Sequence, residues 1–67
     1  RERRAGKEMA RIEGQLAKLE EQIAAMHETM AAAAHDHVKL TGLTGELDDL
    51  LARRESLEEA WLNAAEE

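Results

Sequence analysis

The feature that most constrains the fold is a regular apolar repeat that runs along both halves of the chain. In the first half the intervals alternate between four and three residues, and the repeat consists of Ala5, Met9, Ile12, Leu16, Leu19, Ile23, Met26, Met30 and Ala33. An average spacing of 3.5 residues keeps a narrow apolar stripe against one partner helix, as in a left-handed coiled coil. The first half therefore predicts one helix from about residue 2 to about 34, with Met9 at an a position and Ile12 at a d position.

The second half repeats the pattern with Leu40, Leu43, Leu47, Leu50, Arg54, Leu57, Trp61 and Ala64. His35, Asp36 and His37 join the two stripes. A carboxylate can accept hydrogen bonds from the free N–H groups of a first helical turn, so Asp36 is the expected N-cap. These features predict a turn at about 35–37 and a second helix from about 37 to about 65.

The start of the second helix has an alternative position. Gly42 and Gly45 each cost about 1 kcal/mol relative to alanine inside a helix. The first turns would then fray, and Thr44 would act as a later cap. The sequence leaves both starts open.

The pairing of the two stripes can be derived from the residue numbers. In an antiparallel pair the a positions of one helix lie beside the d positions of the other, and this holds if paired numbers add up to 73. Leu19 then faces Arg54, Ile12 faces Trp61, and the midpoint falls at the Asp36 turn. A shift by one heptad would put the turn at 31–34, where no cap is available, so it is less favoured. The predicted fold class is an all-α, two-helix antiparallel coiled-coil hairpin that forms one domain over residues 1–67.

Composition argues against an enzyme. The chain has 36% charged residues and one tryptophan, but no proline, phenylalanine, tyrosine or cysteine. Its four glycines form no phosphate-binding loop, and Ser56 falls on an outer helix position. We therefore expect no catalytic, cofactor-binding or metal-binding residues in this chain, and we expect no membrane partner because no apolar run approaches the roughly 20 residues that span a bilayer.

Charge is distributed unevenly along the chain. Residues 1–11 hold five basic and two acidic side chains, which gives this stretch a net charge of +3. Because the whole chain has a net charge of −6, the other 56 residues have a net charge of −9. A basic stretch can attract phosphates with a salt-dependent affinity. The predicted nucleic-acid-binding residues are Arg1, Arg3, Arg4, Lys7, Arg11 and Lys18. The alternative is a solvated helix end or the tail of a linker from a preceding domain.

Two seam residues have two interpretations each. Arg54 occupies an a position, where its stem would pack over Leu19 while its guanidinium reaches Glu20 or Glu58; the alternative is a contact with a partner's carboxylate or phosphate. Trp61 is expected to fill the open end of the hairpin opposite Ile12, and its alternative is an exposed anchor.

The histidines form the sharpest local cluster. His35 and His37 flank Asp36, with His27 two turns back, and two imidazoles with a carboxylate could bind zinc or nickel. A polar hairpin tip with a capping aspartate explains the same residues, and we favour it.

The order of these features resembles a known family. The basic lead-in RERRAGKEMARIEGQLAKLEEQI, the tip AAAAHDHVKL and the closing GELDDLLARRESLEEAWLNAAEE are similar to the C-terminal coiled-coil domain of ABC-F ATPases of the Uup type. The stretch Leu57–Leu62, which contains Trp61, is the most characteristic part. The C-terminal arm of valyl-tRNA synthetases is a competing resemblance, although that arm usually has a longer, hydrophobic tip segment.

The resemblance implies a cytoplasmic parent ATPase with two ATP-binding cassettes and no transmembrane segments. The chain would be a C-terminal part of that parent, which would bind ATP and magnesium outside these residues. The implied role of the arm is contact with nucleic acid, either DNA or ribosomal RNA. The alternative is a protein-interaction module that packs on its own ATPase domains, on a ribosomal protein or on a second copy as a homodimer.

Overall fold

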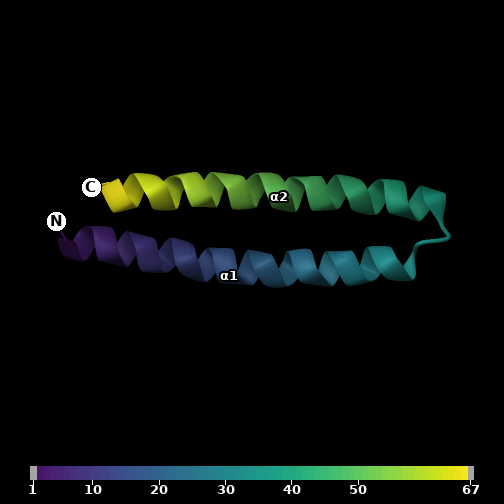
Figure 1. Cartoon of the computed structure of the whole chain (residues 1–67), viewed down its shortest axis with the longest axis horizontal. Coiled ribbons are helices and arrows are strands. Elements are labelled where there is room, and N and C mark those ends of the chain that lie inside the picture. Colours follow the sequence, from purple (N-terminus) through teal and green to yellow (C-terminus); the bar gives the residue numbers. More distant parts are fainter. Residues whose placement is uncertain (1, 67) are drawn as a thin grey trace.

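Two long helices account for nearly the whole molecule. The computed structural model describes residues 2–66, and it describes side chains for residues 6–66. Helix α1 spans Glu2–Ala32 and helix α2 spans His37–Glu66. They run side by side in opposite directions, so both ends of the chain lie at one end of a rod (Figure 1) that measures 52 × 15 × 10 Å. The predicted all-α helical hairpin is confirmed.

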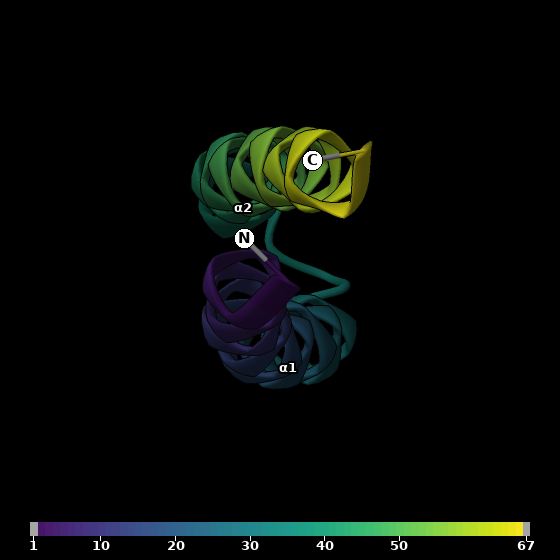
Figure 2. The ribbon, with the colours of Figure 1, turned by 90° about the vertical axis from the view of Figure 1, so that its left-hand side faces the viewer.

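The core is a single line of side chains between the helices. Figure 2 looks along the rod and shows one layer of two helices, without a third element over either side. On α1 the seam residues Ile12, Leu19 and Ile23 are 5%, 3% and 4% exposed. On α2, in contrast, the seam leucines are all half-buried. Two helices can enclose only the middle of their contact, so the α2 leucines keep part of their surface open to solvent.

Helix α1 ends two residues earlier than the sequence predicts. The N–H of Ala33 is shared between the carbonyls of Thr29 and Met30, at 3.1 Å each, and the N–H of Asp36 donates to the carbonyl of Ala33 at 2.9 Å. Bonds to the third preceding residue tighten the backbone into 3₁₀-type turns. The turn therefore covers 33–36, and the expected limits of 34 for the first helix and 35–37 for the turn need this correction.

Asp36 caps helix α2 as predicted. Its Oδ1 atom accepts a hydrogen bond from the backbone N–H of Lys39 at 3.0 Å, and its carbonyl accepts from Leu40 at 2.9 Å. The later start is not adopted. Thr44 lies within the helix, and its hydroxyl donates to the carbonyl of Leu40 at 2.8 Å, so it does not cap a helix N-terminus.

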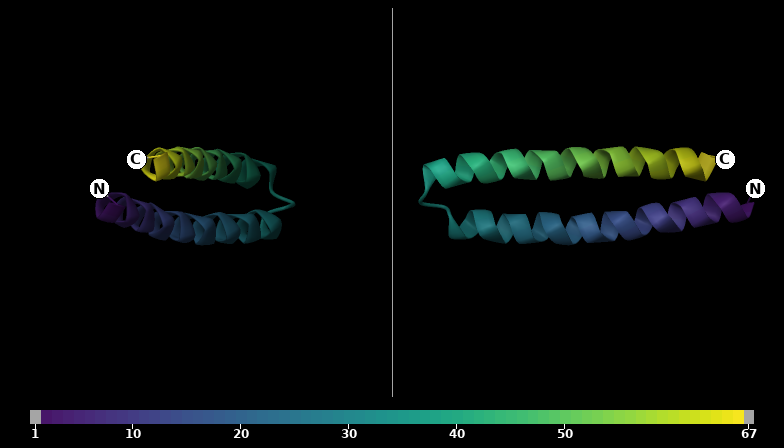
Figure 3. Two further views of the ribbon diagram at one scale, coloured as in Figure 1. Left: turned by 60° about the vertical axis from the view of Figure 1, so that its left-hand side comes forward. Right: turned by 180° about the vertical axis from the view of Figure 1, so that it is seen from behind.

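Two contacts between the helices establish the register. Arg54 Nη1 lies 3.4 Å from Glu20 Oε1, and Trp61 Nε1 donates to Glu13 Oε2 at 3.1 Å. Each pair of numbers adds up to 74, one away from the predicted 73 and eight away from the shifted alternative of 66. The antiparallel pairing along the rod can be followed in an oblique view and from behind in Figure 3. The predicted register is confirmed.

The Asp36 cap predicts a measurable stability difference. Asp36→Ala removes the side-chain acceptor for the Lys39 N–H, so the free energy of unfolding should fall by about 1 kcal/mol in urea titrations followed by circular dichroism. Asp36→Asn keeps an acceptor oxygen and should retain most of the stability. Equal losses in both variants would show that the cap does not stabilise the turn.

The glycines near the start of α2 predict the opposite change. A Cβ atom added at Gly42 or Gly45 would meet nothing within 4 Å. Gly42→Ala and Gly45→Ala should therefore each raise the free energy of unfolding by about 1 kcal/mol in the same titration. Ala52→Gly, at an exposed position of the same helix, is the control and should lower it by a similar amount. A loss of stability in the alanine variants would contradict the open packing.

Candidate nucleic-acid interface

The structure describes three of the six predicted nucleic-acid-binding side chains. Arg1 lies outside the described residues, and the side chains of Arg3 and Arg4 lie outside the described part of α1. Lys7, Arg11 and Lys18 are exposed. Their spacings of four and seven residues place them within about 40° of one another around α1, so they share one face of the helix.

Arg11 is partly engaged within its own helix. Its Nη2 atom donates to both carboxylate oxygens of Glu8, one of them at 3.1 Å. The Arg11 side chain is 66% exposed and that of Glu8 is 40% exposed, and solvent-accessible pairs of this kind contribute about 0–1 kcal/mol. A phosphate can compete for the guanidinium of Arg11, although Glu8 lowers the local positive charge.

A shallow groove on one flank of the seam brings basic side chains of both helices together. Lys18 of α1 and Arg53 of α2 line a depression of about 310 Å³ with Gln15 and Gln22. A second depression continues the groove toward the chain ends, and Gln15 lines both. We call this surface the basic groove; its polar lining residues are Glu8, Arg11, Gln15, Lys18, Gln22, Arg53 and Asn63, of which Glu8 is acidic.

Arg53 was not among the residues that the sequence predicted to bind nucleic acid. It lies 35 positions after Lys18, in a stretch where Arg54 is basic and the other charged residues are acidic. The signal that could have identified it is the register, because numbers that add up to about 73 place Arg53 beside Gln22. The structure confirms that the two residues line one groove.

The other flank of the seam has the opposite character. Glu13, Leu16, Glu58, Trp61 and Leu62 line a depression of about 360 Å³, which we call the acidic groove. In a coiled coil the g and e positions lie on the two sides of the a and d seam. Gln15, Gln22 and Arg53 are at g positions, and Glu13 and Glu58 are at e positions, so the two grooves lie on opposite sides of the seam.

Two residues of like charge, Glu13 and Glu58, line this second groove together. The indole N–H of Trp61 donates to Glu13 at 3.1 Å. The indole of Trp61 therefore holds one oxygen of the Glu13 carboxylate within the acidic groove.

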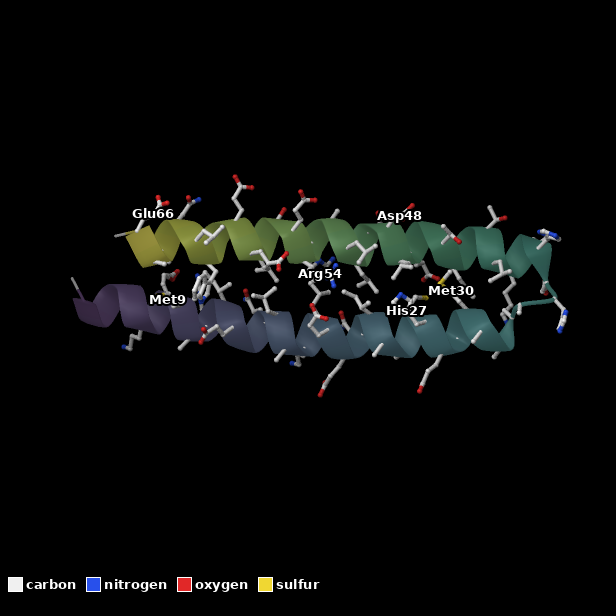
Figure 4. The ribbon with its side chains drawn as sticks, viewed as in Figure 1. Met9, His27, Met30, Asp48, Arg54 and Glu66 are labelled. Atoms are coloured by element: carbon white, nitrogen blue, oxygen red, sulfur yellow. The ribbon has the colours of Figure 1, made fainter. Side chains whose placement is uncertain are left out.

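Arg54 plays the structural part expected of it. Figure 4 shows its side chain between the helices, in contrast to Asp48 and Glu66, which point outward. Its guanidinium meets Glu20, and Leu19, its partner in the register, is 3% exposed. Arg54 therefore covers the seam at the level of Leu19 while its charge reaches the edge of the hairpin.

The residues that the structure describes offer no metal centre. Among them, no group of three or more histidines and carboxylates lies close enough to hold a metal ion. His27 lies on the body of α1, away from the turn (Figure 4), and His35 and His37 are exposed at the tip. The tip is better explained by its capping aspartate.

Within residues 2–66, neither helix contains an apolar stretch that could span a bilayer.

The seam position of Arg54 gives a third prediction. Arg54→Leu restores the apolar repeat opposite Leu19, so the free energy of unfolding should rise by about 1 kcal/mol. The measurement is urea unfolding, with sedimentation velocity to detect any new self-association. Arg53→Leu, on the exposed flank, is the control and should change stability by less than about 0.5 kcal/mol. A less stable Arg54→Leu variant would mean that the ion pair with Glu20 outweighs the apolar contact.

The hairpin matches a known protein family. Residues 2–66 match the model of a family described as the ABC transporter C-terminal domain, which covers the whole described hairpin. Searches of curated proteins and of solved structures gave no significant match.

Proposed function

The chain belongs to the ABC transporter C-terminal domain family, and from this we propose that it is a non-catalytic arm that contacts nucleic acid for its parent ATPase. The proposed parent is an ATPase of the ABC-F type in the cytoplasm, and the contact is with the phosphates of DNA or ribosomal RNA. ATP and magnesium would bind to the cassettes of the parent. The similarity of the lead-in, tip and closing helix to that family supports the ABC-F assignment.

The observation that carries the proposal is the pairing of Lys18 and Arg53 across one groove. The two cations come from different helices, so their proximity depends on the folded hairpin. Gln15 and Gln22 add amide donors to the same surface, and phosphate oxygens accept hydrogen bonds from both types of group. The groove is therefore suited to the nucleic-acid backbone.

Charge segregation supports this assignment in a chain whose net charge is −6. A uniformly acidic surface would repel a polyanion over about 10 Å at moderate ionic strength. In this hairpin the acidic side chains of the e flank are separated from the basic groove by the width of the seam. The rod shape adds to the argument, because a parent that holds the ends of the chain can extend the groove along nucleic acid.

Charge reversal tests the proposed surface. Lys18→Glu should weaken binding of the 67-residue chain to a short DNA duplex or a ribosomal RNA helix by at least about tenfold at low salt, because it replaces an attraction with a repulsion. Arg53→Glu should have a similar effect. Fluorescence anisotropy of labelled nucleic acid gives the affinities, and circular dichroism checks that each variant is helical.

Lys39→Glu is the matched control for this experiment. It makes the same change in net charge at the exposed tip, next to the N-terminus of α2, where a carboxylate is favourable to the helix. It should change the affinity by less than about threefold. Equal losses in the Lys18 and Lys39 variants would indicate attraction to the overall charge, and unchanged binding in the Lys18 and Arg53 variants would contradict the proposed groove.

A further inference from the structure

The acidic groove holds apolar surface that the seam does not use. Leu62 lies at the edge of this groove and is 57% exposed. Trp61, the one tryptophan of the chain, is only half-buried. Leu51, also half-buried, lies on the same flank of α2. Leu51 and Leu62 are eleven residues apart, so they lie within about 20° of each other around the helix and about 16 Å apart along it. Leu16, Trp61 and Leu62 form an apolar strip in the groove, and Leu51 is a further apolar site along the same flank, beyond Glu55 and Glu58.

Carboxylates border this strip from both helices. Glu13 of α1 and Glu58 of α2 line the groove together with Trp61. Within residues 6–66, neither carboxylate forms an ion pair, and the Trp61 N–H engages one oxygen of Glu13. An apolar strip with carboxylates on both sides is complementary to an apolar helix face that has basic residues on both sides.

We propose that the acidic groove binds a basic amphipathic helix of a partner protein. The apolar face of that helix covers Leu51, Trp61 and Leu62. Its flanking lysines or arginines lie beside Glu13 and Glu58, as e and g residues do between the strands of a coiled coil. The hairpin and its partner then form a three-helix assembly in which α2 is covered on a second side.

Charge favours a basic helix over nucleic acid or a second copy of the chain as the occupant of the acidic groove. Nucleic acid would be repelled by Glu13 and Glu58, which are not neutralised within the described residues. A second copy of the chain brings a net charge of −6 toward an acidic surface. A basic helix gains from both carboxylates and from the apolar strip, because apolar burial contributes roughly 25 cal/mol per Å².

Trp61 provides a direct test, since it is the sole tryptophan and lies in the groove. The probe is a synthetic amphipathic peptide of about 18 residues, with leucines at helical spacing and lysines elsewhere. Titration into the 67-residue chain should shift the Trp61 emission to shorter wavelength, and calorimetry should give a saturable one-to-one isotherm. The same peptide with glutamate in place of lysine should produce neither signal.

Two matched pairs of variants locate the binding. Glu13→Gln with Glu58→Gln should weaken binding of the lysine peptide by at least about fivefold, whereas Glu21→Gln with Glu59→Gln removes two charges from the outer f positions and should change it by less than about twofold. Leu62→Ala should also weaken binding. Val38→Ala, at an 85% exposed site near the tip, should not.

Three results would overturn the proposal. They are equal effects of the two glutamine pairs, equal affinity for the lysine and glutamate peptides, and an unchanged Trp61 emission at saturating lysine peptide. The proposal is independent of the nucleic-acid contact, because Lys18→Glu and Arg53→Glu alter the opposite groove. Those variants should leave the affinity for the lysine peptide no weaker.

Discussion

The antiparallel pairing of a with d positions is the constraint on which the rest of the structure depends. Once Leu19 faces Arg54 and the Asp36 turn sets the midpoint, every flanking residue has a determined neighbour. In an antiparallel pair, g positions meet g positions and e positions meet e positions. The g flank therefore brings Lys18, a neighbour of the g residues, beside Arg53. The e flank brings Glu13 beside Glu58 and Trp61.

The thin seam leaves apolar surface of the hairpin exposed to solvent. Two helices enclose Leu19 and Ile23 almost completely, but the facing leucines of α2 remain half-buried. Each of these leucines has apolar surface that a further helix could cover, so the fold presents long grooves on its flanks. The two grooves differ in charge although they share one seam. The two surfaces proposed above, one for phosphates and one for a basic helix, therefore lie on opposite flanks of a rod 15 Å wide.

Much of the fold could be predicted because local rules decide it. The 4-3 repeat predicted both helices. The position of Asp36 between them predicted the N-cap, and in the structure its Oδ1 atom accepts a hydrogen bond from the Lys39 N–H at 3.0 Å. The prediction was wrong at the end of α1. There the alanine run 31–34 contains no stop signal, and a 3₁₀-type bond pattern decides the boundary. The possible late start at Thr44 failed for a related reason, since a threonine hydroxyl can bond to the carbonyl four residues back as easily as it can cap.

The candidate site could be predicted only in part. Lys7, Arg11 and Lys18 could be proposed from their closeness in the sequence, and of these Arg11 and Lys18 line the basic groove. Arg53 could not be proposed in that way, because it lies 35 positions after Lys18 and becomes its neighbour only through pairing of the helices.

The sequence by itself determined that this chain forms two amphipathic helices, that the second begins after Asp36 and in which register they pair, since periodicity and capping act over a few residues. Only the tertiary structure decided which charges share a groove and how much of Trp61, Leu51 and Leu62 remains open. Those properties depend on side chains of opposite helices and on how far two helices can cover each other.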